Sequence, residues 1–185
     1  MNGVPMTGED ILWAIQRISS PASDSVMVFV SDSVTAGLLW FVMAAVMMCS
    51  PRYRAMGMAV IVSVCVTYLV TDAVLKPLFD TMRPFETMDV QPIVPAPDNA
   101  SFPSGHTASS FAAATAMFLF DRRIGSVAGA YACLVGFSRM YLFMHWPADV
   151  VGGALVGILC TLSVMFFMRR RIPCFKGFCE DAGNQ

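Results

Sequence analysis

The sequence predicts an all-α protein, a multi-pass membrane helical bundle of about five transmembrane helices with an interfacial amphipathic helix at its N-terminus. Hydrophobic residues make up 56% of the 185 residues and charged residues only 14%. Ordinary soluble domains have roughly 45–50% and about 25%. Five apolar stretches approach the roughly 20 residues that a helix needs to cross a bilayer. Such a composition excludes an intrinsically disordered chain, and the net charge of −1 offers no basic field for nucleic acid.

Residues 1–32 are expected to form an interfacial segment that precedes the bundle. Thr7 is suited to cap a helix with an acidic first turn. One face of this helix carries the apolar residues Ile11, Leu12, Ile15 and Ile18. The pattern predicts an amphipathic helix that lies in the outer interface and ends near Pro21. The alternative is a longer first span that begins at Val26 and includes Asp32.

The five apolar stretches form the expected transmembrane core, residues 33–168. They run about Ser33–Cys49, Ala55–Leu75, Thr107–Phe120, Ile124–Phe143 and Ala148–Met168. The third is short, and we expect the polar residues at its start to complete it by facing a wet cavity. Residues 169–185 then form a cytoplasmic tail, and residues 1–185 form a single membrane-embedded domain.

Two spacings of small residues are suited to close helix packing. They are Gly125-x3-Gly129 and Gly153-x3-Gly157. We expect both to pack inside the bundle rather than at a dimer interface.

The basic residues between the spans predict the orientation of the bundle. One side holds eight of them: Arg52, Arg54, Arg122, Arg123, Arg169, Arg170, Arg171 and Lys176. The other side holds four: Arg17, Lys76, Arg83 and Arg139. Because Lys and Arg in loops stay cytoplasmic, the side with eight is the inner one. Residues 76–106 and 138–149 then face the extracytoplasmic side of the cell membrane.

The stretch Pro84–Pro103 contains five prolines and is expected to be an extended outer loop rather than a helix. Within it, Asn99-Ala100-Ser101 matches the glycosylation acceptor pattern, a triplet that also arises often by chance. None of the six cysteines lies in an outer loop, so no disulfide framework is expected.

Both histidines of the chain, His106 and His145, lie beside helix starts on the outer side. Three cations share that side with them: Lys76, Arg83 and Arg139. Each cation alone could be explained by a side chain that reaches from a span end to the membrane interface. That explanation does not account for the position of all three cations on the same side as both histidines. Three fixed cations predict an oxyanion with several charged oxygens, most naturally a phosphate.

The residues around the two histidines favour phosphate chemistry. Ser104 is suited to cap the third span, and Gly105 lets an anion approach the free N–H groups at that helix start. Ordinary capping is the alternative for these two residues alone. Asp149, four residues after His145, can hold one imidazole nitrogen and leave the other free for attack. His106 can then give a proton to the leaving oxygen.

These residues form three motifs: Lys76-x6-Arg83-Pro84, Pro103-Ser104-Gly105-His106 and Ser138-Arg139-x5-His145-x3-Asp149. In order and at every motif position, they resemble the signature motifs of the type 2 phosphatidic acid phosphatase family. The resemblance implies an all-helical core shared with vanadium haloperoxidases and bacterial acid phosphatases. It also implies phosphoester hydrolysis through a phosphohistidine, without metal or cofactor. Larger members commonly have six spans, so the first is expected to be missing here or replaced by the N-terminal helix.

The resemblance also implies roles for single residues. His145 is the implied nucleophile, Asp149 its partner and His106 the general acid. The implied phosphate-binding residues are Lys76, Arg83, Ser104, Gly105 and Arg139.

The expected function is that of an integral membrane lipid phosphatase acting on a terminal phosphate. Candidate substrates are undecaprenyl pyrophosphate, phosphatidylglycerophosphate, phosphatidic acid and a lipid A phosphate, and no residue chooses among them. One alternative is a phosphotransferase that uses the same phosphohistidine. The other is a non-enzymatic membrane scaffold or transporter, against which the intact catalytic set argues. The expected partners are the lipid substrate and membrane lipids, with no nucleic acid.

Overall fold

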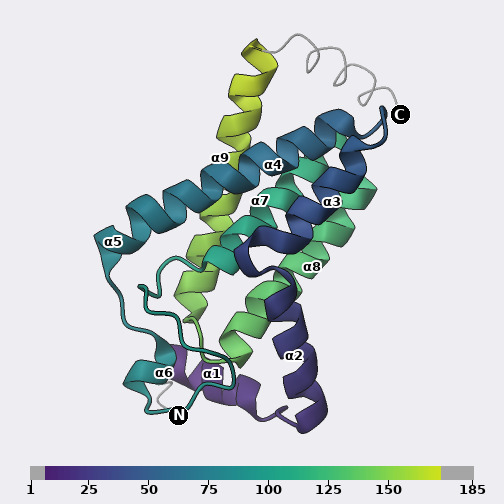
Figure 1. The fold of residues 1–185 in the computed structure, drawn as a ribbon. Coiled ribbons are helices and arrows are strands. Elements are labelled where there is room, and N and C mark those ends of the chain that lie inside the picture. The colour runs from purple at the N-terminus through teal and green to yellow at the C-terminus, as the bar shows by residue number, and fades with distance from the viewer. Residues whose placement is uncertain (1–6, 172–185) are drawn as a thin grey trace, which may run out of the picture.

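The computed structural model describes residues 7–171, and every regular element in this range is a helix, which confirms the all-α prediction. Figure 1 shows long helices packed side by side, with the short helices and the long loop gathered at one end of the molecule. That end is the one expected to face outward. The cytoplasmic tail expected from residue 169 begins inside the last helix, and its remaining residues lie outside the described range.

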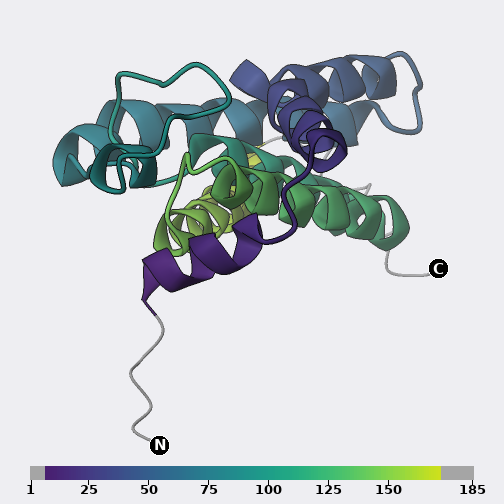
Figure 2. The same cartoon turned by 90° about the horizontal axis from the view of Figure 1, so that it is seen from below.

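The first helix, α1 (Gly8–Gln16), begins where the sequence predicts it. Thr7 accepts a hydrogen bond from the backbone N–H of Asp10, whose carboxylate in turn accepts from the N–H of Thr7. This reciprocal pair satisfies two donors that a helix start leaves open. Figure 2 shows α1 running across the ends of the bundle helices, where it packs on α8 (Arg122–Tyr141) and α9 (Pro147–Arg171).

Helix α2 (Pro21–Ser33) occupies much of the segment that was expected to be interfacial. Ser20 caps it and Pro21 stands in its first turn, so Pro21 begins a new helix as well as separating it from α1. The helix continues through residue 32 without a boundary there. Together with α3 (Leu38–Met48) it forms a pair bent by 49°, long and apolar enough for one broken span. This arrangement corresponds to the alternative first span, with Asp32 inside it.

The next span is continuous but not uniform. Helix α4 (Arg54–Tyr68) passes into a π-helical segment, η2 (Leu69–Leu75), and then into α5 (Lys76–Phe79). The outer loop that follows begins with a short helix, α6 (Pro84–Thr87), so the expectation of a wholly extended stretch is wrong at its start. The cause is local: the fixed φ of a proline suits a first helical turn, and the Glu86 carboxylate accepts from the N–H of Arg83 at 2.6 Å.

Helix α7 (Gly105–Phe120) is the centre of the bundle and packs on α4, α8 and α9. The contact with α9 is close because α9 carries glycines there. A Cβ added to Gly153 would lie 2.6 Å from the Ser104 carbonyl oxygen, and one added to Gly157 only 2.2 Å from that of Ala108. The second small-residue spacing therefore packs inside the bundle, as expected. In the first spacing, Gly125 also packs closely, because an added Cβ would lie only 2.2 Å from Phe118 Cα on α7, whereas a Cβ on Gly129 would meet no atom within 4 Å.

Two helical stretches, Arg54–Thr87, which is interrupted at residues 80–83, and Pro147–Arg171, are each long and apolar enough to cross a membrane. The bent pair of α2 and α3 is a third candidate within the described residues. Helix α7 has 16 residues, about 24 Å at 1.5 Å per residue, which is short of a bilayer core. Its position inside the bundle shields it from lipid.

Candidate active site

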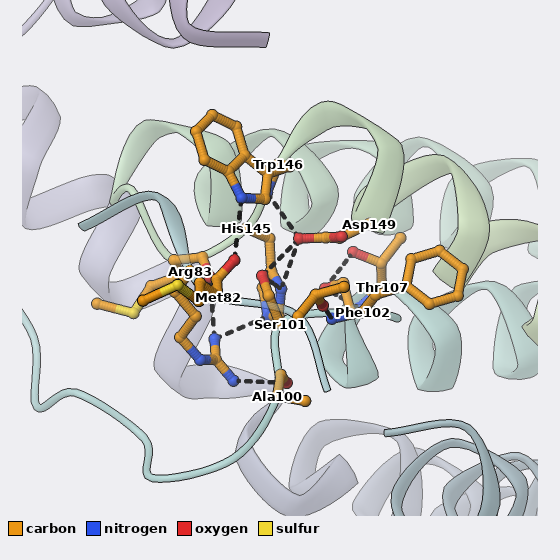
Figure 3. A network of polar contacts seen from close by, with 12 residues as sticks. Met82, Arg83, Ala100, Ser101, Phe102, Thr107, His145, Trp146 and Asp149 are labelled. Atoms are coloured by element: carbon orange, nitrogen blue, oxygen red, sulfur yellow. Dashed lines mark hydrogen bonds and ion pairs between the residues drawn. The ribbon is translucent and has the colours of Figure 1, made fainter. Parts of the chain in front are cut away.

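His145 and Asp149 meet at the end of the bundle that holds the long loop, where the chain turns from α8 into α9. The distance from His145 Nδ1 to Asp149 Oδ2 is 3.6 Å, and both side chains are buried. The same carboxylate oxygen accepts from the backbone N–H of Trp146 at 2.8 Å and from the hydroxyl of Ser101 at 2.5 Å. Figure 3 shows these groups converging on the carboxylate. The predicted pairing of imidazole and carboxylate is therefore present in the fold, with Nε2 directed away from Asp149.

Ser101 is a site residue that the sequence reasoning missed. Its side chain is fully buried, and its hydroxyl lies 3.4 Å from His145 Nδ1 as well as 2.5 Å from Asp149. The chance glycosylation triplet Asn99-Ala100-Ser101 is thus a structural part of the site. The only sequence signal for a role of Ser101 in the site is its position shortly before the motif that contains Pro103 and His106.

Arg83 connects the outer loop to His145. Its guanidinium donates to the backbone carbonyl of Asn99 at 3.0 Å, to the Asn99 side chain at 2.6 Å and to the Met144 carbonyl at 2.9 Å. The Nη1 atom of Arg83, which donates to the Met144 carbonyl, also lies 3.4 Å from His145 Nε2 (Figure 3). A phosphoryl group carried on Nε2 would therefore sit beside a fixed cation, which is where a bidentate donor stabilises it best.

The surroundings of His145 favour a neutral imidazole. Burial is the largest influence and lowers the pKa of His145, whereas the nearby Asp149 carboxylate raises it. The nearby positive charges of Arg139 and Arg83 lower it further. A neutral ring keeps a lone pair on one nitrogen, as a nucleophile requires.

Lys76, Gly105 and His106 lie together on a cavity of about 560 Å³. The Lys76 ammonium donates to Asp72 at 2.5 Å, and both groups lie 3.8 Å from where a Cβ on Gly105 would be. The rest of the wall is largely apolar and comes from the α2–α3 break, α3, α4 and η2 (among others Val34, Phe41, Val64 and Leu69). The cavity thus has a polar end at the start of α7 and an apolar body between helices. Asp72 lies outside the three sequence motifs, so its place in the cavity wall could not be read from them.

Ser104 and Arg139 are held by the protein itself. The Ser104 hydroxyl accepts from the Thr107 hydroxyl at 2.9 Å, and its backbone N–H donates to the carbonyl of Asp149. The Ser104 hydroxyl also accepts from the backbone N–H of Thr107 and so caps α7. The guanidinium of Arg139 is buried and donates to the Ser31 hydroxyl on α2 at 2.5 Å. Its Nε has no hydrogen-bond partner among the residues that the structure describes.

Comparison with known protein families identifies the family to which these three motifs belong. The family model of the PAP2 superfamily matches residues 56–173, more than half of the chain and all three motifs. The chain belongs to the PAP2 superfamily.

Similarity to individual proteins agrees with this assignment. The undecaprenyl-diphosphatase BcrC of Bacillus subtilis is 30% identical over 164 residues, which cover 85% of this chain and 81% of that protein. The putative undecaprenyl-diphosphatase YbjG of Escherichia coli is 39% identical over 88 residues, 46% of this chain and 44% of that one. The expected enzyme class is confirmed: this PAP2 protein is a membrane lipid phosphatase.

Two solved structures share the fold. The crystal structure of a transmembrane PAP2-type phosphatidylglycerolphosphate phosphatase from Bacillus subtilis superimposes with a TM-score of 0.73 at 27% identity, covering 90% of this chain and 86% of that one. LpxE of Aquifex aeolicus also gives 0.73, at 24% identity, covering 85% of this chain and 94% of that one. The second likeness bears on the fold alone. The all-α bundle of this phosphatase is thus a PAP2 transmembrane fold.

Proposed function

We propose that this phosphatase removes the terminal phosphate of undecaprenyl diphosphate at the outer leaflet of the cell membrane, through a phosphohistidine on His145. The observation that carries the proposal is the cavity whose polar end holds Lys76 and His106 and whose body is apolar. A phosphate attached to a long hydrocarbon chain has the same polarity. The undecaprenyl-diphosphatase that aligns over most of this chain favours an isoprenoid diphosphate among such lipids.

The geometry supports a role for each group in two steps. Nε2 of His145 attacks the terminal phosphorus, and the bond to the oxygen of the lipid phosphate breaks. His106 lines the cavity, so it can give a proton to the oxygen of the departing lipid. The carboxylate of Asp149 holds Nδ1–H and stabilises the positive ring that forms. Water then cleaves the N–P bond with His106 as base, releasing phosphate and restoring both histidines.

The phosphoryl charge is neutralised by the protein in this proposal. Arg83, Arg139 and Lys76 surround the transferred group, and the N–H groups at the start of α7 beside Gly105 add partial positive charge. Ser104 supports them by capping α7.

Hydrolysis is expected to need no divalent cation. The two carboxylates near the cavity and His145 already have partners, because Asp149 accepts from Ser101 and Trp146 and Asp72 accepts from Lys76. Phosphate release by the purified protein should therefore be the same within about twofold with and without excess EDTA. Loss of turnover in EDTA that magnesium restores would contradict the mechanism.

We also propose five spans with α1 in the outer interface, which places the site outside the cytoplasm. Single cysteines in a cysteine-free background test this orientation on intact cells. An impermeant maleimide should label Asp98→Cys, on the outer loop, and should leave Pro51→Cys, on the Arg-rich loop between α3 and α4, unlabelled until the cells are opened. Both positions are exposed. The reverse pattern would place the substrate in the inner leaflet.

The substrate assignment is tested by phosphate release from a panel of lipids in detergent micelles. The panel holds undecaprenyl diphosphate, phosphatidylglycerophosphate, phosphatidic acid and a lipid A phosphate. The expected result is a kcat/KM for undecaprenyl diphosphate at least about tenfold above the others, a difference of 1.4 kcal/mol. A higher value for another lipid would replace the substrate. A phosphorylated acceptor in place of free phosphate would indicate a phosphotransferase.

A further inference from the structure

A serine in the broken first span, the bent pair of α2 and α3, contacts the buried Arg139 of the site. Ser31 lies on α2, before residue 56 where the family match begins, and its side chain is almost fully buried. Its hydroxyl accepts from Nη1 of Arg139 at 2.5 Å across the interface between α2 and α8. None of the three motifs includes a residue of this span.

The break after Ser31 is built into the backbone. Ala36 has φ +52° and Gly37 φ +74°, both in the left-handed region, which interrupts the helix between α2 and α3. A Cβ on Gly37 would lie 3.0 Å from the ring of Phe41 and 3.3 Å from Val64, so a larger residue there is strained twice over. Left-handed alanine costs free energy that surrounding packing must offset, and such residues concentrate at functional sites.

The same break brings the chain against the start of α7. The short helix η1 (Thr35–Gly37) packs on α7, and the Thr35 hydroxyl lies 3.4 Å from His106 Nε2. Residues 34, 36 and 37 line the cavity. The broken span therefore reaches both the general acid and the phosphate-binding arginine proposed above.

Arg139 has an incomplete set of partners. Its side chain is 5% exposed, Nη1 is satisfied by Ser31, and Nε has no partner in the described part of the chain. A buried donor without a partner is costly, and a phosphate oxygen would satisfy it. Because the arginine side chain has several rotatable bonds, a hydrogen bond at Nη1 fixes the direction in which Nε–H points.

We propose that Ser31 is a positioning residue of the active site, which orients the Arg139 guanidinium so that its Nε–H meets a phosphoryl oxygen of the substrate. The break between α2 and α3 supports this contact by seating the first span against α7 and α8. The inference rests on the proposed function, since it takes Arg139 as a phosphate ligand. It adds a functional role for a helix that the family match does not include.

The experiment compares Ser31→Ala with Ser33→Ala. Ser33 is a matched control because its hydroxyl also bonds across to α8, to Tyr131 at 2.7 Å, away from the cavity. Vanadate serves as the probe, since it mimics a phosphoryl group in transfer. Its dissociation constant is measured by titration of the purified proteins, with melting temperatures recorded to compare folding. Ser31→Ala should weaken vanadate binding and lower kcat/KM by about tenfold, the effect of one hydrogen bond to a charged group. Ser33→Ala should stay within about twofold.

A double-mutant cycle separates positioning from general packing. In an Arg139→Ala background, Ser31→Ala should change the vanadate dissociation constant no further, because Ser31 acts only through that arginine. Additive losses, or equal losses in the Ser31 and Ser33 variants, would make Ser31 a packing residue and overturn the inference. Unchanged vanadate binding in Ser31→Ala would also overturn it. Failure of the proposed function is distinct, because then the unmodified protein itself would neither release phosphate nor bind vanadate.

Discussion

Replacement of His145 by alanine should lower phosphate release by more than about a thousandfold for every substrate, as loss of a nucleophile does in other covalent enzymes. The covalent step needs Nε2, which lies 3.4 Å from the Arg83 guanidinium and is the ring nitrogen directed away from Asp149. Turnover is measured with a natural lipid phosphate and with an activated aryl phosphate, alongside the melting temperature to show that the variant folds.

His106→Ala serves as the matched comparison, because it removes the other histidine. Loss of a general acid costs about 10²–10⁴-fold where the leaving oxygen needs protonation, and much less for an aryl phosphate. The two variants should therefore differ in their dependence on the leaving group. Radiolabelled phosphate should be trapped on the unmodified protein in acid-labile form and not on His145→Ala. Phosphate release by His145→Ala above one hundredth of the normal rate would argue against a phosphohistidine on this residue.

Arg83→Lys should lower kcat/KM by about 10²–10³-fold although the charge is kept, an effect comparable to loss of one fixed donor to a transition state. A lysine cannot donate in the fork that joins Asn99, Ala100 and Met144 to His145. Both the phosphate site and the position of the loop depend on that fork. Steady-state kinetics on micellar lipid give the change, and the melting temperature should fall as well.

Arg17→Lys is the control for the charge exchange itself. Arg17 is exposed next to the end of α1, at the same end of the molecule. Its replacement should leave both kinetics and melting temperature unchanged. If Arg83→Lys behaved like Arg17→Lys, then the guanidinium geometry at position 83 would be irrelevant to catalysis.

The sequence predicts the catalytic motifs well because their chemistry is unusual in an apolar chain. Two histidines and three cations beside span ends cannot be explained by lipid contact, and the fold brings His145, Asp149 and Arg83 together. The helices α4, α8 and α9 follow from hydropathy, since a continuous apolar run leaves few choices of structure. The cap of α1 could also be predicted from the sequence, because Thr7 and its partner Asp10 lie within one helical turn.

Two of the missed site residues depend on contacts between distant segments. Ser31 and Ser101 are ordinary polar residues in their local sequence, and only the fold places them beside Arg139 and Asp149. The extent of the first span stayed open between two alternatives for a similar reason. Asp32 lies on a helix that also carries Ser31 against the buried Arg139, a contact that the local sequence does not show.

The fork of Arg83 has a consequence for how fast this enzyme can work. The guanidinium donors bond to the backbone and side chain of residues 99–100. That part of the outer loop therefore loses its conformational entropy when the protein folds and not when the substrate binds. A lipid phosphate that binds then meets a catalytic surface whose shape is set beforehand, and its binding energy is not consumed in ordering this segment. More of that energy is left for the transition state.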